Sequence, residues 1–275
     1  MRTLVLSGGG AKGAMQIACV AELYRQGKTW DNIVGVSAGA LNAAGIAFFG
    51  AQQSREFWKT INKKSDILSM NIFSLLWKQG LYSLSPLEKI LQRTFRDLPG
   101  EFTPFWTGTT DLAGGEVSFQ AGTNDTSILI PNLIHSCTIP AIMESSGLKM
   151  DGGVRDTVPL SYAIKGLLSD DIDVVMCQTL DRNQWLKDDG WKPTWPKILS
   201  IANRAVDILS SEVTWGDIEM CRMRNNQDGF RKVSVNIYAP VDRPPLDTLD
   251  FEKDLIHKGI EYGISMAKEP VMVVS

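Results

Sequence analysis

Short apolar runs separated by glycine-rich turns form the start of the chain. Residues 3–6 are a short apolar run of the kind that forms a buried strand, and residues 33–36 repeat it with β-branched side chains. Residues 14–26 carry apolar side chains at helical spacing, and Gly27 suits the end of that helix. Residues 38–49 predict a second, buried helix. This strand–helix–strand–helix opening predicts an α/β fold with a mostly parallel sheet covered by helices.

The remaining pattern predicts further helices and strands. We expect amphipathic helical sequence over 52–100, a hairpin over 109–120 with its turn at 113–115, a strand at 172–178, a helix over 198–223, a strand at 233–238 and an amphipathic helix over 251–266.

The chain shows no internal repeat, no low-complexity tract and no Pro/Gly/Ser linker. We therefore expect one domain over residues 1–275, with variable helical or cap regions at 52–105 and 182–232. The length of 275 residues is enough to bury a core without disulfides or metals.

Composition narrows the class of protein. Lys plus Arg number 28 and Asp plus Glu number 31, so the basic surplus typical of nucleic-acid binders is missing. The four cysteines are dispersed without CxxC spacing, which predicts buried free thiols rather than a disulfide scaffold or a zinc site. We see no signal peptide and no apolar stretch long enough to cross a bilayer. The expected location is cytoplasmic or peripheral to a membrane, and export without a signal stays open.

A glycine cluster, Gly8-Gly9-Gly10-Ala11-Lys12-Gly13, lies between the first predicted strand and helix. A dinucleotide site would need an acidic residue at the end of the second strand, and none is there. A phosphate-binding P-loop would need Lys and Ser or Thr after the last glycine, where Ala14 stands. Backbone amides at a helix N-terminus also stabilise an oxyanion. An oxyanion hole and an ordinary tight turn are the two interpretations left.

A possible nucleophile follows the second predicted strand. Gly35-Val36-Ser37-Ala38-Gly39 is a GxSxG sequence that opens a predicted helix, which is the setting of a nucleophile elbow. The flanking glycines allow the strained turn that presents the Ser37 hydroxyl. The chain has two histidines. We expect His257 on a helix surface and a structural role for His135, so Ser37 needs another base.

A carboxylate can supply that base. In Asp151-Gly152-Gly153 the aspartate is followed by two residues without side chains, so its carboxylate could reach Ser37 and take the proton directly. Alone, this tripeptide is a common turn. Its occurrence after the other two motifs favours a Ser–Asp pair.

The three motifs, in this order, resemble the signatures of the patatin-like phospholipases. Weaker similarities are Thr110-Asp111-Leu112 with Gly115-Glu116, Ser136-Cys137-Thr138-Ile139-Pro140, and Val158-Pro159-Leu160.

The resemblance implies a three-layer α/β/α fold and a Ser–Asp dyad that needs no metal or other cofactor. By motif, Ser37 is the nucleophile, Asp151 is the proton acceptor, and Gly8, Gly9 and Gly10 form the oxyanion hole. The residues that support the motifs are Lys12, Gly13, Gly35, Gly39, Gly152 and Gly153.

Lys12 lies in the first motif, and Thr157 lies shortly after the third. Lys12 stands where the family often has Lys or Arg. Thr157 departs from the asparagine of many members, and we expect this to affect packing near the dyad rather than the dyad itself.

The implied reaction is hydrolysis of acyl esters of membrane phospholipids by a serine phospholipase A, of type A1 or A2, through an acyl-enzyme. For this, the pKa of Asp151 must allow ionisation near neutral pH. A lysophospholipase or thioesterase with the same dyad, a membrane-degrading effector that needs an activator, and a regulatory protein without activity are the alternatives. The expected partner is phospholipid at a membrane surface, and a homo-oligomer or an activator stays open.

Two apolar segments are candidates for membrane contact. Trp185, Trp191 and Trp195 cluster with lysines, and tryptophan favours the membrane interface. Residues 72–77 form the second candidate. Core or dimer packing is the alternative interpretation of both.

Overall fold

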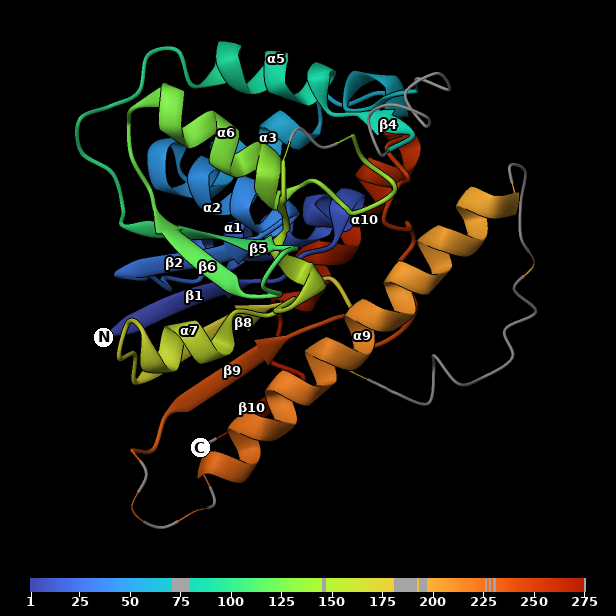
Figure 1. Ribbon diagram of the computed structural model, residues 1–275. Coiled ribbons are helices and arrows are strands. Elements are labelled where there is room, and N and C mark those ends of the chain that lie inside the picture. Colours follow the sequence, from blue (N-terminus) through green and yellow to red (C-terminus); the bar gives the residue numbers. More distant parts are fainter. Residues whose placement is uncertain are drawn as a thin grey trace.

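A mixed β-sheet forms the centre of the computed structural model (Figure 1). The structure describes residues 1–70, 80–144, 147–180, 192, 197–225, 227, 229 and 231–274. The strands of the sheet are β1 (Arg2–Leu6), β2 (Asn32–Val36), β5 (Phe105–Asp111), β6 (Val117–Ala121), β7 (Lys149–Asp151), β8 (Asp171–Val175), β9 (Ser234–Tyr238) and β10 (Met272–Val274). Within the described residues their order is β10-β9-β8-β1-β2-β5-β6, and β7 also pairs with β5.

The centre of the sheet is parallel. Strands β9, β8, β1, β2 and β5 pair in parallel, whereas β10, β6 and β7 pair antiparallel at the margins. The inner strands β1 and β2 are nearly continuous apolar runs because both of their faces are covered. In the register, Leu6 lies opposite Gly35 on one side and Val175 on the other. The turns that follow these strands therefore leave the sheet at the same edge.

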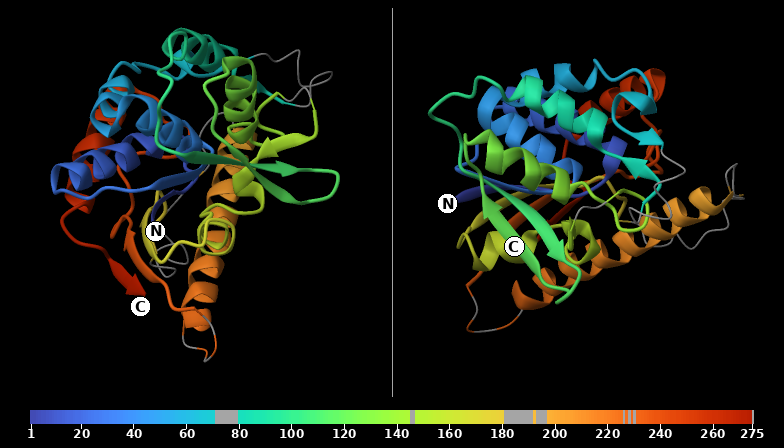
Figure 2. Two further views of the ribbon diagram at one scale, coloured as in Figure 1. Left: turned by 90° about the vertical axis from the view of Figure 1, so that its left-hand side faces the viewer. Right: turned by 45° about the horizontal axis from the view of Figure 1, so that its top comes forward.

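Helices cover both faces of the sheet and complete three layers (Figure 1). One face carries α1 (Gly13–Arg25), α2 (Ala38–Phe49), α3 (Ala51–Trp58), α5 (Ser85–Thr94), α6 (Thr126–Ser136) and α10 (Lys253–Met266). The other face carries α7 (Leu160–Lys165) and α9 (Lys197–Asn225). Figures 1 and 2 show α9 as a long helix that extends past the edge of the sheet. The three-layer α/β prediction is confirmed.

The core lies in two apolar clusters, one on each side of the sheet. Leu4 and Leu6 of β1 pack with α1, α2 and α10, whereas Val5 packs with α7 and α9. This follows from the alternation of side chains along a strand. Among the described residues, none of the helices has both the length and the apolar character needed to cross a membrane.

Residues 52–100 differ from the uniformly helical prediction. Besides α3, α5 and a 3₁₀ turn, η2 (Lys64–Asp66), they contain β3 (Ser69–Met70) and β4 (Tyr82–Ser83), which pair antiparallel. The amides of Leu81 and Tyr82 also donate to the carbonyl of Ile142. The extended conformation near Tyr82 thus depends on hydrogen bonds to Ile142, a residue far away in the sequence. The local pattern of apolar residues could not predict these bonds. The division into one domain with variable regions stays a prediction.

Candidate active site

Three loops meet at the edge of the sheet where the parallel strands end. The glycine loop follows β1, and Ser37 follows β2, its parallel neighbour. Val36 lies opposite Gly108 on β5, and the next residue of β5, Thr109, lies opposite Asp151 on β7. This register places Asp151 at the level of Ser37. The sheet therefore brings together the three motifs that the sequence singled out.

Ser37 occupies a strained turn. Its backbone has φ 57° and ψ −128°, a region that non-glycine residues rarely adopt, and its side chain is buried. A Cβ at Gly35 would lie 2.2 Å from the carbonyl oxygen of Gly39, and one at Gly39 would lie 2.4 Å from that of Leu6. Glycine at both positions thus permits the sharp strand-to-helix turn of a nucleophile elbow.

Ser136, the last residue of α6, stabilises this turn through two hydrogen bonds. Its Oγ accepts a hydrogen bond from the amide of Ser37 at 2.9 Å and donates to the carbonyl of Gly108 at 2.7 Å. Ser136 ends α6 and is completely buried. The strained peptide is therefore fixed to β5 through one hydroxyl.

Asp151 is buried beside the side chain of Ser37. Its Oδ1 also accepts from the amide of Gly153 at 2.8 Å. Burial raises the pKa of Asp151 to about 6, and the nearby Ser37 hydroxyl and the amide of Gly153 limit the rise. At neutral pH most molecules would hold this carboxylate ionised beside the hydroxyl. The pair has the composition of a nucleophile and its base.

The backbone amides of the glycine loop, Gly8–Gly10, differ in whether they donate a hydrogen bond within the protein. The amide of Gly8 donates to the carbonyl of Thr157 at 3.1 Å, and the carbonyl of Gly9 accepts from the amide of Lys12 at 3.2 Å. Within the described part of the chain, the amides of Gly9 and Gly10 have no protein acceptor. Both glycines border a cavity that Ser37 also lines. The two amides without a protein acceptor thus belong to residues that line the same cavity as Ser37.

Glycine is required in this loop for steric reasons. A Cβ at Gly9 would lie 2.3 Å from the Cβ of Cys177, and one at Gly10 would lie 2.2 Å from the carbonyl oxygen of Thr248. Gly10 also has φ +57°. Lys12, the basic residue of the motif, is buried.

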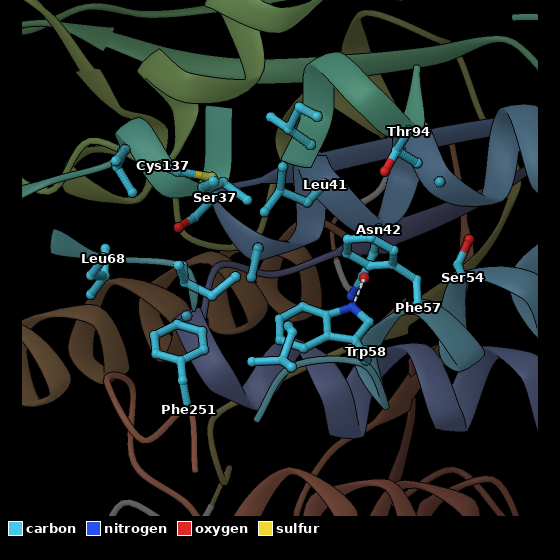
Figure 3. Close-up of a pocket in the computed structure, with 18 of the residues that line it drawn as sticks. Ser37, Leu41, Asn42, Ser54, Phe57, Trp58, Leu68, Thr94, Cys137 and Phe251 are labelled. Atoms are coloured by element: carbon cyan, nitrogen blue, oxygen red, sulfur yellow. Dashed lines mark hydrogen bonds between the residues drawn. The ribbon is translucent and has the colours of Figure 1, made fainter. Parts of the chain in front are cut away.

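Two cavities meet at Ser37. The first, of about 320 Å³, lies among α2, α3 and α5 and is mostly apolar (Figure 3). The second, of about 260 Å³, lies between the glycine loop, the turn after Asp151, and α9. From α9, Leu209 and Val213 line the second cavity. A ligand that reacts at Ser37 could place one part in each space.

The carboxamide of Asn42, in the wall of the first cavity, is hydrogen-bonded to other protein groups. Asn42 Nδ2 donates to the carbonyl of Gly13 and to Gln16 Oε1, both at 2.9 Å. Its Oδ1 accepts from Trp58 Nε1 at 2.8 Å (Figure 3). Because this carboxamide is satisfied within the wall, it places no demand for a polar ligand group. A hydrocarbon chain suits this cavity.

The histidines lie elsewhere. His135 stands in the last turn of α6 and His257 stands on α10, and neither lines the two cavities. Burial, and then the charge of Lys149, lower the pKa of His135. Among the described residues, no group of three or more His, Cys, Asp or Glu side chains is arranged to hold a metal ion. The four cysteines are free and buried.

The predicted membrane-contact segments and Thr157 differ in what the structure says of them. The tryptophan cluster at 185, 191 and 195 and the segment 72–77 lie outside the described residues. Thr157 contributes more than packing, since its carbonyl accepts from Gly8 and its Oγ1 donates to the carbonyl of Gly153 at 3.0 Å. The sequence did not predict these two hydrogen bonds, because both acceptors are backbone carbonyl groups and every residue type has one.

Comparisons with known proteins extend these observations. A family model described as "Patatin-like phospholipase" matches residues 4–164. "Lysophospholipase nte1" of Aspergillus niger is 24% identical over 296 residues, which cover 94% of this chain and 18% of that protein. "Patatin-like phospholipase domain-containing protein 7" of Rattus norvegicus is 24% identical over 279 residues, covering 94% and 20%. The chain thus spans about a fifth of the length of these curated relatives.

Similarity to solved structures includes one from a bacterium. The crystal structure of VipD from Legionella pneumophila aligns with a TM-score of 0.43 and 13% identity, over 97% of this chain and 66% of that one.

Proposed function

The chain belongs to the patatin-like phospholipase family, and from this we propose that it is a serine lipid acyl hydrolase of the phospholipase A type. One observation carries the proposal. Ser37, in a strained turn, lies beside buried Asp151 at the point where an apolar cavity meets the glycine loop.

The proposed chemistry is acyl transfer in two steps. Asp151 takes the proton of Ser37 while Oγ attacks the ester carbonyl, and the glycine loop Gly8–Gly10 receives the oxyanion through the amides of Gly9 and Gly10. An essential oxyanion donor is typically worth about 3–4 kcal/mol. The C–O bond then breaks, and the alcohol leaves with the proton from Asp151. Water then attacks the acyl carbonyl while Asp151 takes its proton. The bond between this carbon and Ser37 Oγ breaks, Oγ regains the proton from Asp151, and the fatty acid leaves.

The first cavity would bind the acyl chain. It follows α2 from Ser37 past Leu41 and Gly45 to Phe49, which is about 18 Å along a helix axis. Each methylene buried there contributes about 0.8 kcal/mol. The second cavity would receive the alcohol part of the ester. The proposed substrate is thus a phospholipid presented at a membrane surface.

Fatty-acid release from phosphatidylcholine and phosphatidylglycerol mixed micelles in EDTA tests the proposal. We expect release by the wild type and a loss of at least about a hundredfold in Ser37→Ala and Asp151→Asn. A short soluble ester serves as the parallel substrate. Full activity of either variant would contradict the dyad, and a wild type that hydrolyses neither lipid nor ester would contradict the function.

A lysophospholipase is the second candidate, because relatives carry that name. Lysophosphatidylcholine and phosphatidylcholine, compared at equal micellar mole fraction, separate the two. Faster release from the diacyl lipid supports phospholipase A. Release from the single-chain lipid alone would replace that proposal with a lysophospholipase.

A further inference from the structure

Gln178 lies beside the glycine loop. Strand β8 pairs in parallel with β1, and Val175 at its end is opposite Leu6. The segments that follow these two strands therefore leave the sheet side by side. Gln178 is 4% exposed and borders the second cavity together with Ser37 and Gly9. The sequence motifs did not mark this residue.

Both ends of the Gln178 carboxamide are engaged at the loop. Nε2 donates to the carbonyl oxygen of Gly8 at 2.9 Å. The Ser7 hydroxyl lies 3.2 Å from Gln178 Oε1 and 3.1 Å from the same carbonyl oxygen. Ser7 Oγ in turn accepts from the amide of Cys177 at 2.9 Å. The carbonyl of Gly8 thus accepts from Gln178 Nε2, and the single Ser7 proton lies within reach of both this carbonyl and Gln178 Oε1.

Fixing this carbonyl also fixes the next amide. A trans peptide unit is planar, so the carbonyl of Gly8 and the amide N–H of Gly9 point in opposite directions. The other end of Gly8 is tied by its own amide to Thr157. The Gly9 amide is therefore turned away from Gln178, and within the described residues it has no protein acceptor.

We propose that Gln178 is a positioning residue for the oxyanion hole. Its hydrogen bond to the carbonyl of Gly8 fixes the orientation of the Gly8–Gly9 peptide, so that the amide of Gly9 points toward the developing negative charge. This role rests on the proposed function of Ser37 and Asp151. A carboxamide suits it because one group donates to Gly8 while the other accepts from Ser7, which neither methionine nor an ionised glutamate does.

The test compares Gln178→Met and Gln178→Glu with the wild type on p-nitrophenyl butyrate. We expect kcat to fall about 10- to 100-fold while KM changes less than about twofold, since a misaimed oxyanion donor acts in the transition state. Gln52→Met, on the exposed side of α3, is the matched control and is expected to match the wild type.

A second readout is specific to the oxyanion. In the thiono analogue of the ester, sulfur replaces the carbonyl oxygen and accepts hydrogen bonds poorly. We expect the wild-type preference for the oxo ester to fall about tenfold in both variants. In Gln178→Met the acid limb of the pH–rate profile should keep its position, because this substitution introduces no charge into the cavity that Asp151 lines. Gln178→Asn, which keeps the carboxamide on a shorter chain, provides a gentler variant if the others do not fold.

The outcomes separate the two proposals. A wild type that neither hydrolyses esters nor is labelled at Ser37 by a fluorophosphonate contradicts the proposed function. With an active wild type, folded Gln178 variants that stay within twofold in kcat overturn the positioning role. Equal losses on the oxo and thiono esters also overturn it, because they indicate a general structural defect.

Discussion

The amide of Gly8 donates to the carbonyl oxygen of Thr157 at 3.1 Å and so joins the loop after β1 to the loop that follows Asp151. Thr157 also donates through Oγ1 to the carbonyl of Gly153, two residues after Asp151. The two sides of the proposed site are therefore connected mainly by backbone atoms. Their spacing depends on the fold of both loops rather than on one long side chain.

Hydrolysis should have an acid limb near pH 6. Asp151 must be ionised to take the proton of Ser37, and burial raises its pKa to about 6. We expect kcat/KM for a soluble ester to rise about tenfold per pH unit below that value and to level off above it. Measurement between pH 4.5 and 8 checks this. A flat profile across the range would contradict Asp151 as the base.

Stability should fall as the pH rises from about 4 to about 8. Burial raises the pKa of Asp156 to about 8, and the facing carboxylate of Asp217 on α9 acts in the same direction, whereas Arg155 opposes it. The folded protein thus keeps a proton that an unfolded aspartate loses, so the free energy of unfolding decreases with pH in this window and is constant above it. Asp151 adds the same trend up to about pH 6.

Urea unfolding of Asp156→Asn at pH 5, 7 and 9 measures this effect. We expect the stability of the variant relative to wild type to increase with pH, because the neutral amide removes the cost of ionisation. Asp97→Asn, at an exposed position, is the control. A difference between variant and wild type that does not change with pH would disprove the assignment.

A larger residue at Thr94 should shorten the accepted acyl chain. Thr94 and Phe95 line the first cavity, and Phe95 stacks on Phe49, at the far end of α2 from Ser37. We expect Thr94→Phe to lower kcat/KM for long-chain p-nitrophenyl esters by about fourfold per excluded methylene and to leave the butyrate unchanged. Thr94→Ser is the control. A uniform loss at all chain lengths would argue against this cavity as the acyl site.

The same substitution at two helical glycines should have opposite effects. A Cβ at Gly39 would meet the carbonyl oxygens of Leu6 at 2.4 Å and Ser7 at 2.7 Å, whereas Gly216 on α9 has nothing within 4 Å. We expect Gly39→Ala to lower the free energy of unfolding by at least about 1–3 kcal/mol. Gly216→Ala should raise it by up to about 1 kcal/mol. Denaturant unfolding checks both, and equal shifts would contradict the packing argument.

The sequence predicted those parts of the molecule whose residue types are dictated locally. A strand that ends in a glycine turn and opens a helix must carry glycine where the chain approaches another backbone, so 8–13 and 35–39 were recognisable. The helix predicted over 38–49 has those bounds in the structure.

Long-range contacts were not predictable in the same way. The strand at Tyr82 forms against residues near 142, and the carboxyl pair Asp156–Asp217 brings a turn close to a helix residue 61 positions later. Gln178 stands after the end of β8 without any motif, and its proposed importance comes from the peptide that it faces. Such roles depend on register between strands, which residue type does not encode.

The division of space around Ser37 has a consequence for the order of product release. Ser37 borders one cavity among α2, α3 and α5 and a second beside α9. In the proposed reaction, the alcohol departs through the α9 side while the fatty acyl group stays bound on the other side. Water then enters the place that the alcohol has left, without displacement of the chain. The first product therefore has its own exit, and the second is free to follow only after hydrolysis.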